Sequence, residues 1–148
     1  MPNIERINVT LRRTGVVAGE TNGCGLRNYA WIKYDPDYIL DYRTVVHEMG
    51  HNLGLLHEHQ RPDRDNYLTV NVTGSQFDKI EEKYARFLWW TWKTRSVTYS
   101  STYDYMSIMH YRNSYYNPWF SDKNGGYINT GGTTISSTDA EFIKLIYK

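Results

Sequence analysis

An eleven-residue segment limits how this chain can fold and what it can bind. From His47 to His57 it reads H-E-x-x-H-x-x-G-x-x-H. Residues four apart lie on one face of a helix, about 5–6 Å apart, so His47 and His51 can offer ring nitrogens to one metal ion. Gly54 can adopt the left-handed conformation that ends a helix, and the turn lets His57 approach the same ion from outside. Three neutral histidines leave one tetrahedral position open, which predicts a catalytic zinc site with one Zn²⁺ per chain.

Glu48 follows the first predicted ligand and lies beside the metal, where a carboxylate can act as general base on a metal-bound water. The simpler alternative is that these are ordinary polar residues, because H-E-x-x-H alone is a weak signal. Four of the five histidines in the chain fall between positions 47 and 59, at fixed offsets. That clustering favours the metal site.

Bulk composition narrows the remaining choices. The 148 residues suit one domain, 1–148, with a single core. A formal charge of +1 gives no electrostatic reason to expect binding to nucleic acid or to an anionic membrane. The apolar run from Phe87 to Trp90 is too short to span a bilayer. The single cysteine, Cys24, excludes an internal disulfide framework. We therefore expect binding to neither nucleic acid nor membranes; we also expect a monomer.

Hydrophobic periodicity places the segment on a helix and surrounds it with short elements. Alternation predicts a half-buried strand over 4–11, with Ile7, Val9 and Leu11 on its buried side. A second strand is expected over 28–34 and a short one over 67–70. The ligand helix should run from about Ile39 to Leu53 with Met49 on its apolar side. Segments 14–26 and 111–134 are expected to be mainly loop.

Two further helices are predicted toward the C-terminus. One is capped near Ser75, and its inward residues recur at helical spacing: Phe77, Ile80, Tyr84 and Leu88. The other opens at a capping box over 138–141 and turns three apolar side chains inward: Phe142, Leu145 and Ile146.

A second motif lies about fifty residues after the third histidine. Ser107-Ile108-Met109-His110-Tyr111 would mean little alone, but beside the histidine motif it resembles the Met-turn of the metzincins. The stretches 57–67 and 103–111 both resemble the astacin family of zinc endopeptidases. This resemblance implies that Met109 forms an apolar floor beneath the ligands and that Glu58 is the glutamate that follows the third histidine. It also implies that Tyr111 is a further zinc ligand at rest, which swings away to stabilise the tetrahedral intermediate.

The resemblance further implies an α+β, metzincin-like domain: a small twisted sheet over the zinc helix, and a C-terminal helix. The implied activity is zinc-dependent hydrolysis of peptide bonds, with Glu48 as base and Tyr111 holding the oxyanion. The partner is then a peptide or protein bound in extended conformation. The short stretch 51–54 is closer to an adamalysin, but such a protein has aspartate after the third histidine and lacks the tyrosine. The alternative is an astacin-like zinc-binding module with little turnover that acts as a peptide-binding protein.

Two expectations concern the ends of the domain. The segment before the zinc helix is shorter than in the family. No signal peptide is visible in residues 1–14, so the protein is either intracellular or a mature form whose Met1 is not the natural start; of these we expect a secreted or extracellular mature form. In astacins the freed amino terminus pairs with the glutamate after the third histidine. Met1 instead begins a strand-like segment, so we expect Glu58 to be exposed, or paired with Arg61 or Arg64, and to contribute under about 1 kcal/mol.

Overall fold

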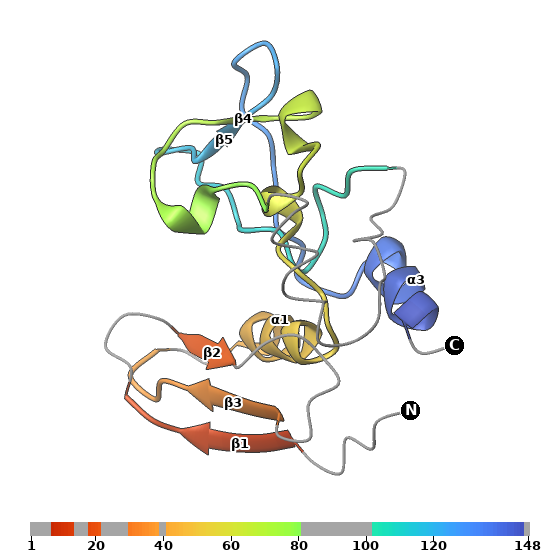
Figure 1. Cartoon of the computed structure of the whole chain (residues 1–148). Coiled ribbons are helices and arrows are strands. Elements are labelled where there is room, and N and C mark those ends of the chain that lie inside the picture. The colour runs from red at the N-terminus through yellow and green to blue at the C-terminus, as the bar shows by residue number, and fades with distance from the viewer. Residues whose placement is uncertain (1–6, 14–17, 22–29, 39–40, 81–101, 147–148) are drawn as a thin grey trace.

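A three-stranded sheet and the helix packed against it form the N-terminal half of the protein, shown in a computed structural model (Figure 1). The structure describes residues 7–13, 18–21, 30–38, 41–80 and 102–146. The strands are β1 (Ile7–Leu11), β2 (Gly19–Thr21) and β3 (Ala30–Tyr34), in the order β1-β3-β2. β1 runs parallel to β3, while β2 is antiparallel to it and forms the opposite edge. Helix α1 (Tyr42–Asn52) packs against β2 and β3.

The sheet buries only part of the apolar surface that its sequence offers. On β3, Ile32 and Tyr34 are buried, and the Tyr34 hydroxyl donates to the Val45 carbonyl of α1 at 3.1 Å. On β1, Val9 and Leu11 are 60% and 67% exposed, so the predicted half-buried face is wrong. The reason lies in the packing, because α1 contacts chiefly the other two strands.

Helix α1 begins and ends with standard capping interactions. At its start the Asp41 carboxylate accepts a hydrogen bond from the Thr44 amide at 2.7 Å. At its end Gly54 has a φ of 96°, its N–H donates to His51 O, and the Leu55 N–H donates to Gly50 O. This pair of bonds is a Schellman motif and confirms the predicted helix-ending glycine.

The inward face of α1 is polar. Its buried residues are His47, Glu48, Gly50 and Asn52. Met49, predicted on the apolar side, is 43% exposed, so that assignment is wrong. Asn52 donates to Thr21 Oγ1 at 2.7 Å, which ties the end of the helix to β2. A helix that buries histidine and glutamate while exposing methionine is arranged around a site and not only around a core.

The C-terminal half is built from short elements around a separate core. They are the 3₁₀ turns η1 (Glu58–Gln60), η2 (Arg64–Asn66) and η3 (Ser75–Phe77), the antiparallel strands β4 (Thr69–Val70) and β5 (Phe120–Ser121), and helix α3 (Ser137–Ile146). The core side chains are Leu68, Phe77, Tyr103 and Phe120. In Figure 1 the pair β4–β5 lies at the opposite end of the molecule from the three-stranded sheet, and α1 lies between the pair and the sheet.

Several predicted elements differ from the structure. The strands β2 and β5 fall inside segments predicted as loop. The helix expected near Ser75 is a single 3₁₀ turn, because Asp78 is already extended (ψ 144°); Tyr84 and Leu88 lie outside the described residues. The capping box of α3 is two residues earlier than predicted: Ser136 Oγ accepts from the Asp139 amide at 3.0 Å, and Asp139 Oδ2 accepts from the Ser136 amide at 3.1 Å. Leu145 is 51% exposed, so its inward assignment is also wrong.

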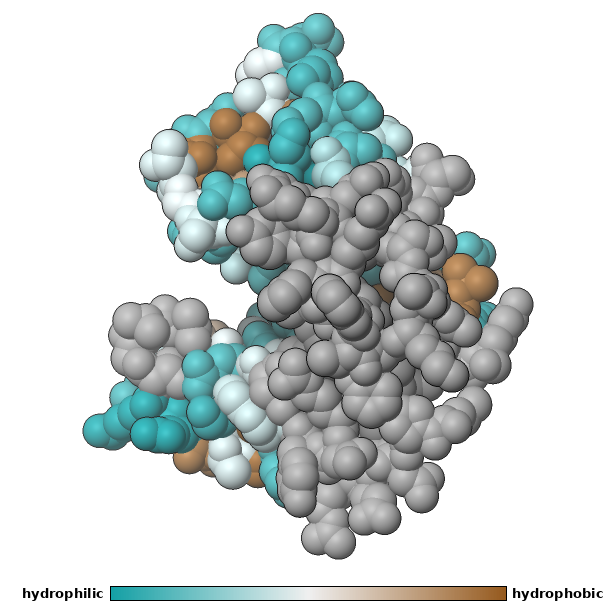
Figure 2. Space-filling model, in the orientation of Figure 1, coloured by the Kyte–Doolittle hydropathy of each residue, from teal (hydrophilic) through white to brown (hydrophobic). Residues whose placement is uncertain are grey.

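None of the helices in the described ranges has the length and apolar character needed to cross a membrane. A notch separates the half that carries the three-stranded sheet from the half that carries β4 and β5 (Figure 2).

Candidate metal centre

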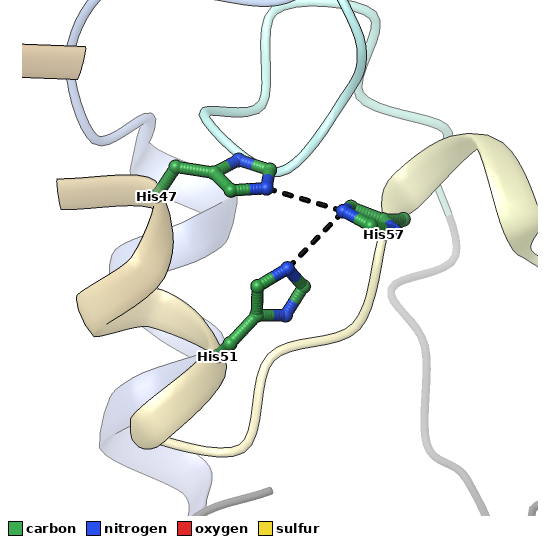
Figure 3. A group of neighbouring side chains, drawn as sticks. All are labelled: His47, His51 and His57. Carbon is green, nitrogen blue, oxygen red and sulfur yellow. Dashed lines mark hydrogen bonds between the residues drawn. The ribbon is translucent and has the colours of Figure 1, made fainter. Parts of the chain in front are cut away.

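Three histidines from one short segment converge on a single point (Figure 3). His47 and His51 project from successive turns of α1, and His57 returns to them after the turn at Gly54. The Nε2 atom of His57 lies 3.1 Å from Nε2 of His47 and 3.1 Å from Nε2 of His51. Their possible ligand atoms all lie within 4.8 Å of one another. The structure therefore brings together the three predicted ligands.

Hydrogen bonds at the outer nitrogens fix which nitrogen of each ring carries the proton. His47 Nδ1 lies 2.8 Å from Ile108 O, and His51 Nδ1 lies 2.9 Å from Leu55 O. His57 Nδ1 lies 2.9 Å from Gln60 Oε1. These oxygens can only accept, so each Nδ1 is the donor. A neutral ring protonated at Nδ1 carries its lone pair at Nε2, and all three lone pairs face one another.

This arrangement fits zinc. The lone pair of His57 Nε2 lies 3.1 Å from the Nε2 atoms of both His47 and His51, and these lone pairs repel one another unless a cation lies between them. The close contacts drawn in Figure 3 therefore hold no shared proton. Zinc binds imidazole nitrogens at about 2.0–2.1 Å, which in a tetrahedral site places the nitrogens about 3.3 Å apart. The donor set and its spacing therefore suit this ion, and the outer hydrogen bonds orient the rings before it binds.

Burial keeps the ligand group neutral. It lowers the pKa of His47 to about 3 and that of His57 to about 2, with the neighbouring histidines adding to the effect. It also lowers the pKa of His51, against the hydrogen bond to Leu55 O. Neutral imidazole is the form that binds a metal, so at neutral pH no proton has to be displaced.

Glu48 lies buried beside this group with strand β2 against it. Desolvation, helped by the charge of Glu20, raises the pKa of Glu48 to about 7. A Cβ on Gly19 would come within 2.9 Å of Glu48 Cγ, so the edge strand approaches the carboxylate as closely as glycine allows. A carboxyl group that titrates near neutrality can both accept and return a proton.

Tyr111 lies against the third ligand. Its ring centroid is 4.7 Å from that of His57 and 4.2 Å from that of His59. Burial raises the pKa of Tyr111, and the nearby charge of Glu48 adds to the shift. The phenol is therefore protonated at neutral pH and can donate a hydrogen bond.

Met109 packs directly on α1. A Cβ on Gly50 would lie 2.6 Å from Met109 Sδ, so this glycine makes room for the thioether on the helix that carries the ligands. Met109 is 1% exposed and packs with Leu55 and Ile108. The sequence motif predicts an apolar floor formed by this methionine, and its burial against α1 is consistent with that role.

Glu58 is paired, but not at an exposed position. Its Oε1 accepts from Arg61 Nη1 at 2.8 Å and from the Asp104 amide at 2.9 Å. The side chain of Arg61 is 6% exposed and that of Glu58 16%, so the expected surface pair is wrong, although Arg61 was one of the two expected partners. The other, Arg64, donates to His59 O at 2.9 Å and pairs with Asp65. Burial raises the pKa of Glu58, against the opposing effects of the hydrogen bond from the Asp104 amide and of the charge and hydrogen bond of Arg61.

Sequence reasoning missed the residues that orient the ligands. Gln60 holds His57, Gly50 accommodates Met109, and Ser107 and Asp139 fix the backbone that His47 contacts. Only Gln60 had a usable signal, because an amide three residues after a ligand can reach back across a 3₁₀ turn.

Comparison with known proteins gives consistent results. The family model named Astacin, which describes a peptidase family, matches residues 30–148. "Zinc metalloproteinase nas-5" of Caenorhabditis elegans is 34% identical over 115 residues, which are 76% of this chain and 27% of that protein. "Astacin-like metalloprotease toxin 4" of Loxosceles laeta is 41% identical over 73 residues, 48% of this chain and 57% of the toxin.

A solved structure has a similar fold. The solved structure of high choriolytic enzyme 1, a hatching enzyme zinc-protease from Oryzias latipes, aligns with a TM-score of 0.67 at 20% identity, covering 94% of this chain and 68% of that one. The chain spans about a quarter or less of the first curated relatives that it matches.

Proposed function

Because this chain belongs to the astacin family, we propose that it is a zinc-dependent endopeptidase. The observation that carries the proposal is the convergence of three Nε2 lone pairs, each fixed by a hydrogen bond at the opposite ring nitrogen. Zinc bound there would supply a Lewis acid that activates water and polarises the scissile carbonyl. His47, His51 and His57 are its proposed protein ligands.

Glu48 is the proposed general base. Its carboxylate takes a proton from the attacking water and delivers it to the nitrogen of the leaving amine. A pKa of about 7 suits both halves of this task, because the group is neither too weak a base nor too weak an acid at neutral pH. Tyr111 is the proposed oxyanion donor and possible additional zinc ligand, since its protonated hydroxyl can hydrogen-bond the oxygen that becomes negative.

The proposed substrate is a peptide in extended conformation. β2 is an edge strand, paired with β3 on one side, and it lies against Glu48. A peptide added along its other edge would lie beside the general base, in the notch between the two halves. We also propose that the chain acts as a monomer and outside the cell; the second point is supported by a relative named as a toxin.

The first test compares wild type with Glu48→Gln. The variant should keep one zinc per chain but lose hydrolysis of a generic protein substrate by about 10²–10⁴-fold, because only the base is removed. Metal content is measured by atomic absorption, and turnover with and without a chelator. Wild-type turnover in the zinc-loaded variant would refute the assignment of the base.

The same experiment separates the enzyme from its rival, an astacin-like module that binds zinc and peptides with little turnover. Zinc-loaded wild type that binds peptide without cleaving it would favour the module. Buried Glu48, with its raised pKa, favours the enzyme, because a binding module gains nothing from a desolvated carboxyl group in its site.

A further inference from the structure

We propose that Asp139, at the start of α3, is a remote positioning residue for the metal ligand His47 and acts through Ser107 and one peptide group. The inference deepens the proposed function and rests on the zinc site described there. It concerns an oriented series of hydrogen bonds that joins a ligand on α1 to a buried carboxylate near the other end of the chain.

The series begins at the outer nitrogen of His47, which donates to Ile108 O at 2.8 Å. The peptide group that contains this carbonyl carries its N–H on Met109, and that N–H donates to Ser107 Oγ at 3.0 Å. The Ser107 hydroxyl then donates to Asp139 Oδ1 at 2.6 Å. Every donor points the same way, so the imidazole, the peptide, the hydroxyl and the carboxylate are polarised in one direction.

Burial strengthens this coupling. Ser107, Ile108 and Met109 are each 1% exposed, Asp139 is 6% exposed and His47 is 7% exposed. Hydrogen bonds in a low-dielectric interior polarise one another cooperatively. The carboxylate therefore makes Ile108 O a stronger acceptor, which fixes the ring of His47 and raises the basicity of its Nε2. Catalytic zinc sites often place a carboxylate directly on a ligand histidine; here the same influence arrives through a hydroxyl and a peptide.

The other two ligands lack such a series among the described residues. The acceptors of His51 and His57 are Leu55 O and Gln60 Oε1, and neither is followed there by a carboxylate. The three rings are thus unequal, and His47 is the one whose basicity the C-terminal helix controls.

Arg43 works against the carboxylate at the same carbonyl. Its Nη2 donates to Ile108 O at 3.3 Å and to His110 O at 2.7 Å, and its Nε donates to Gly132 O at 3.0 Å. A cation that donates to Ile108 O makes this oxygen a weaker acceptor for the Nδ1 proton of His47. The charge of Asp139, acting through the peptide N–H, offsets that effect.

The structure also separates polarisation from simple anchoring. The other oxygen of Asp139, Oδ2, accepts from the Ile108 amide at 2.9 Å and from the Ser136 amide at 3.1 Å, and so anchors the loop without Ser107. Ser107→Ala interrupts the series but leaves these two bonds. The matched control is Ser136→Ala, which removes the cap of α3 and a 2.6 Å bond to Asp104 but leaves the series intact.

The test uses the full chain loaded with zinc. Zinc affinity is measured by competition with a chromophoric chelator, and the Nδ1 proton of each ligand histidine is followed by NMR. Ser107→Ala should weaken zinc binding about 10-fold, the lower end of the range for outer-shell partners. It should also shift the Nδ1 proton of His47 upfield and leave those of His51 and His57 in place. Ser136→Ala should lower Tm by about 2–4 °C but change neither zinc affinity nor the His47 proton.

Equal loss of zinc affinity in both variants, or an unmoved His47 proton in Ser107→Ala, would overturn the inference and leave Asp139 as an anchor. If Ser107→Ala does not fold, Asp139→Asn decides by the same two measurements, since it removes the charge at nearly constant shape. Wild type that binds no zinc would instead refute the proposed function on which the inference rests.

Discussion

Two groups of histidines lie close together in this molecule, and they differ in where their lone pairs point. His47, His51 and His57 donate from Nδ1 and turn three free Nε2 atoms toward one point. His110 is closed by protein at both nitrogens: Nδ1 donates to Tyr111 O at 2.8 Å, and Nε2 accepts from the Tyr103 hydroxyl at 2.9 Å. His59 donates from Nε2 to Gln76 O at 3.0 Å.

Burial alone cannot tell the two groups apart. It lowers the pKa of His59 to about 3 and that of His110 to about 4, as it does for the ligands. What differs is convergence: the free Nε2 atoms of His47, His51 and His57 meet at one point. The lone pair of His110 accepts from Tyr103, and Nδ1 of His59, which is unpaired among the described residues, does not belong to the converging set. A buried histidine is therefore best assigned by the partner of each nitrogen.

Substituting one histidine from each group should have the largest effects, and the two effects should differ in kind. His57→Ala should abolish activity and weaken zinc binding by more than about 100-fold, because a third of the donor set is removed. His110→Phe should keep zinc but lower the free energy of unfolding by about 2–3 kcal/mol, because Tyr103 and Tyr111 O lose their partner. Zinc titration and urea denaturation measure the two effects. Tight zinc binding by His57→Ala would contradict the assignment of His57 as the third ligand.

Acid should affect both groups together. Unfolded histidines take up protons near pH 6.5, whereas folded His47 and His110 resist until about pH 3 and 4. Stability from these lowered pKa values is therefore present above pH 6.5 and is lost as pH falls toward 3, by up to about 1.4 kcal/mol per pH unit for each histidine. Urea midpoints of the metal-free chain at pH 7.5, 6 and 5 measure the loss, and zinc content should fall over the same range. A flat midpoint would contradict the buried, neutral assignment.

Tyr111 contacts a histidine of each group, His57 and His59. Removing its hydroxyl tests whether Tyr111 takes part in the chemistry or only in the packing. Tyr111→Phe keeps the ring against His57 and His59 and removes only the oxygen. If the hydroxyl stabilises the oxyanion, kcat should fall by about 10²-fold with KM nearly unchanged. Steady-state kinetics at fixed zinc measure this. Unchanged kcat would show that Tyr111 packs against His57 and His59 without a chemical role.

Glu58 separates the two groups along the chain, and its change should have the smallest effect. Glu58→Gln removes one of the two carboxylates that pair with buried Arg61 and leaves Asp63, so it should cost about 2 kcal/mol, more than an exposed pair and less than an isolated buried charge. Lys79→Met, which removes the exposed pair with Asp65 and leaves Asp65 paired with Arg64, is the control and should cost about 0.5 kcal/mol. Urea denaturation compares the two. Equal small losses would restore the expectation of a weak surface pair.

The motif was sufficient to predict the convergence of the three histidines, the helix and its glycine end, because their geometry is local. Four-residue spacing and a left-handed glycine act within one or two helical turns. β2 could not be predicted in the same way. A strand of three residues is too short to show an alternating pattern, and it is defined by its pairing with β3. Ser107 and Asp139 meet across 32 positions, and no periodicity encodes that distance. Val9, Leu11 and Met49 were misassigned because amphipathic spacing does not say which neighbour covers a face.

The compactness of the ligand segment has a consequence for how the chain folds. Bringing three ligands together from eleven consecutive residues costs little loop-closure entropy, so the site can assemble early and locally. The contacts that complete it are remote: His47 meets Ile108 across 61 positions, and Glu58 meets Asp104 across 46. Contacts of such high sequence separation form slowly. A metal bound early by the segment from His47 to His57 would then act as a nucleus for folding. The segment around Met109 would pack against it in a later step.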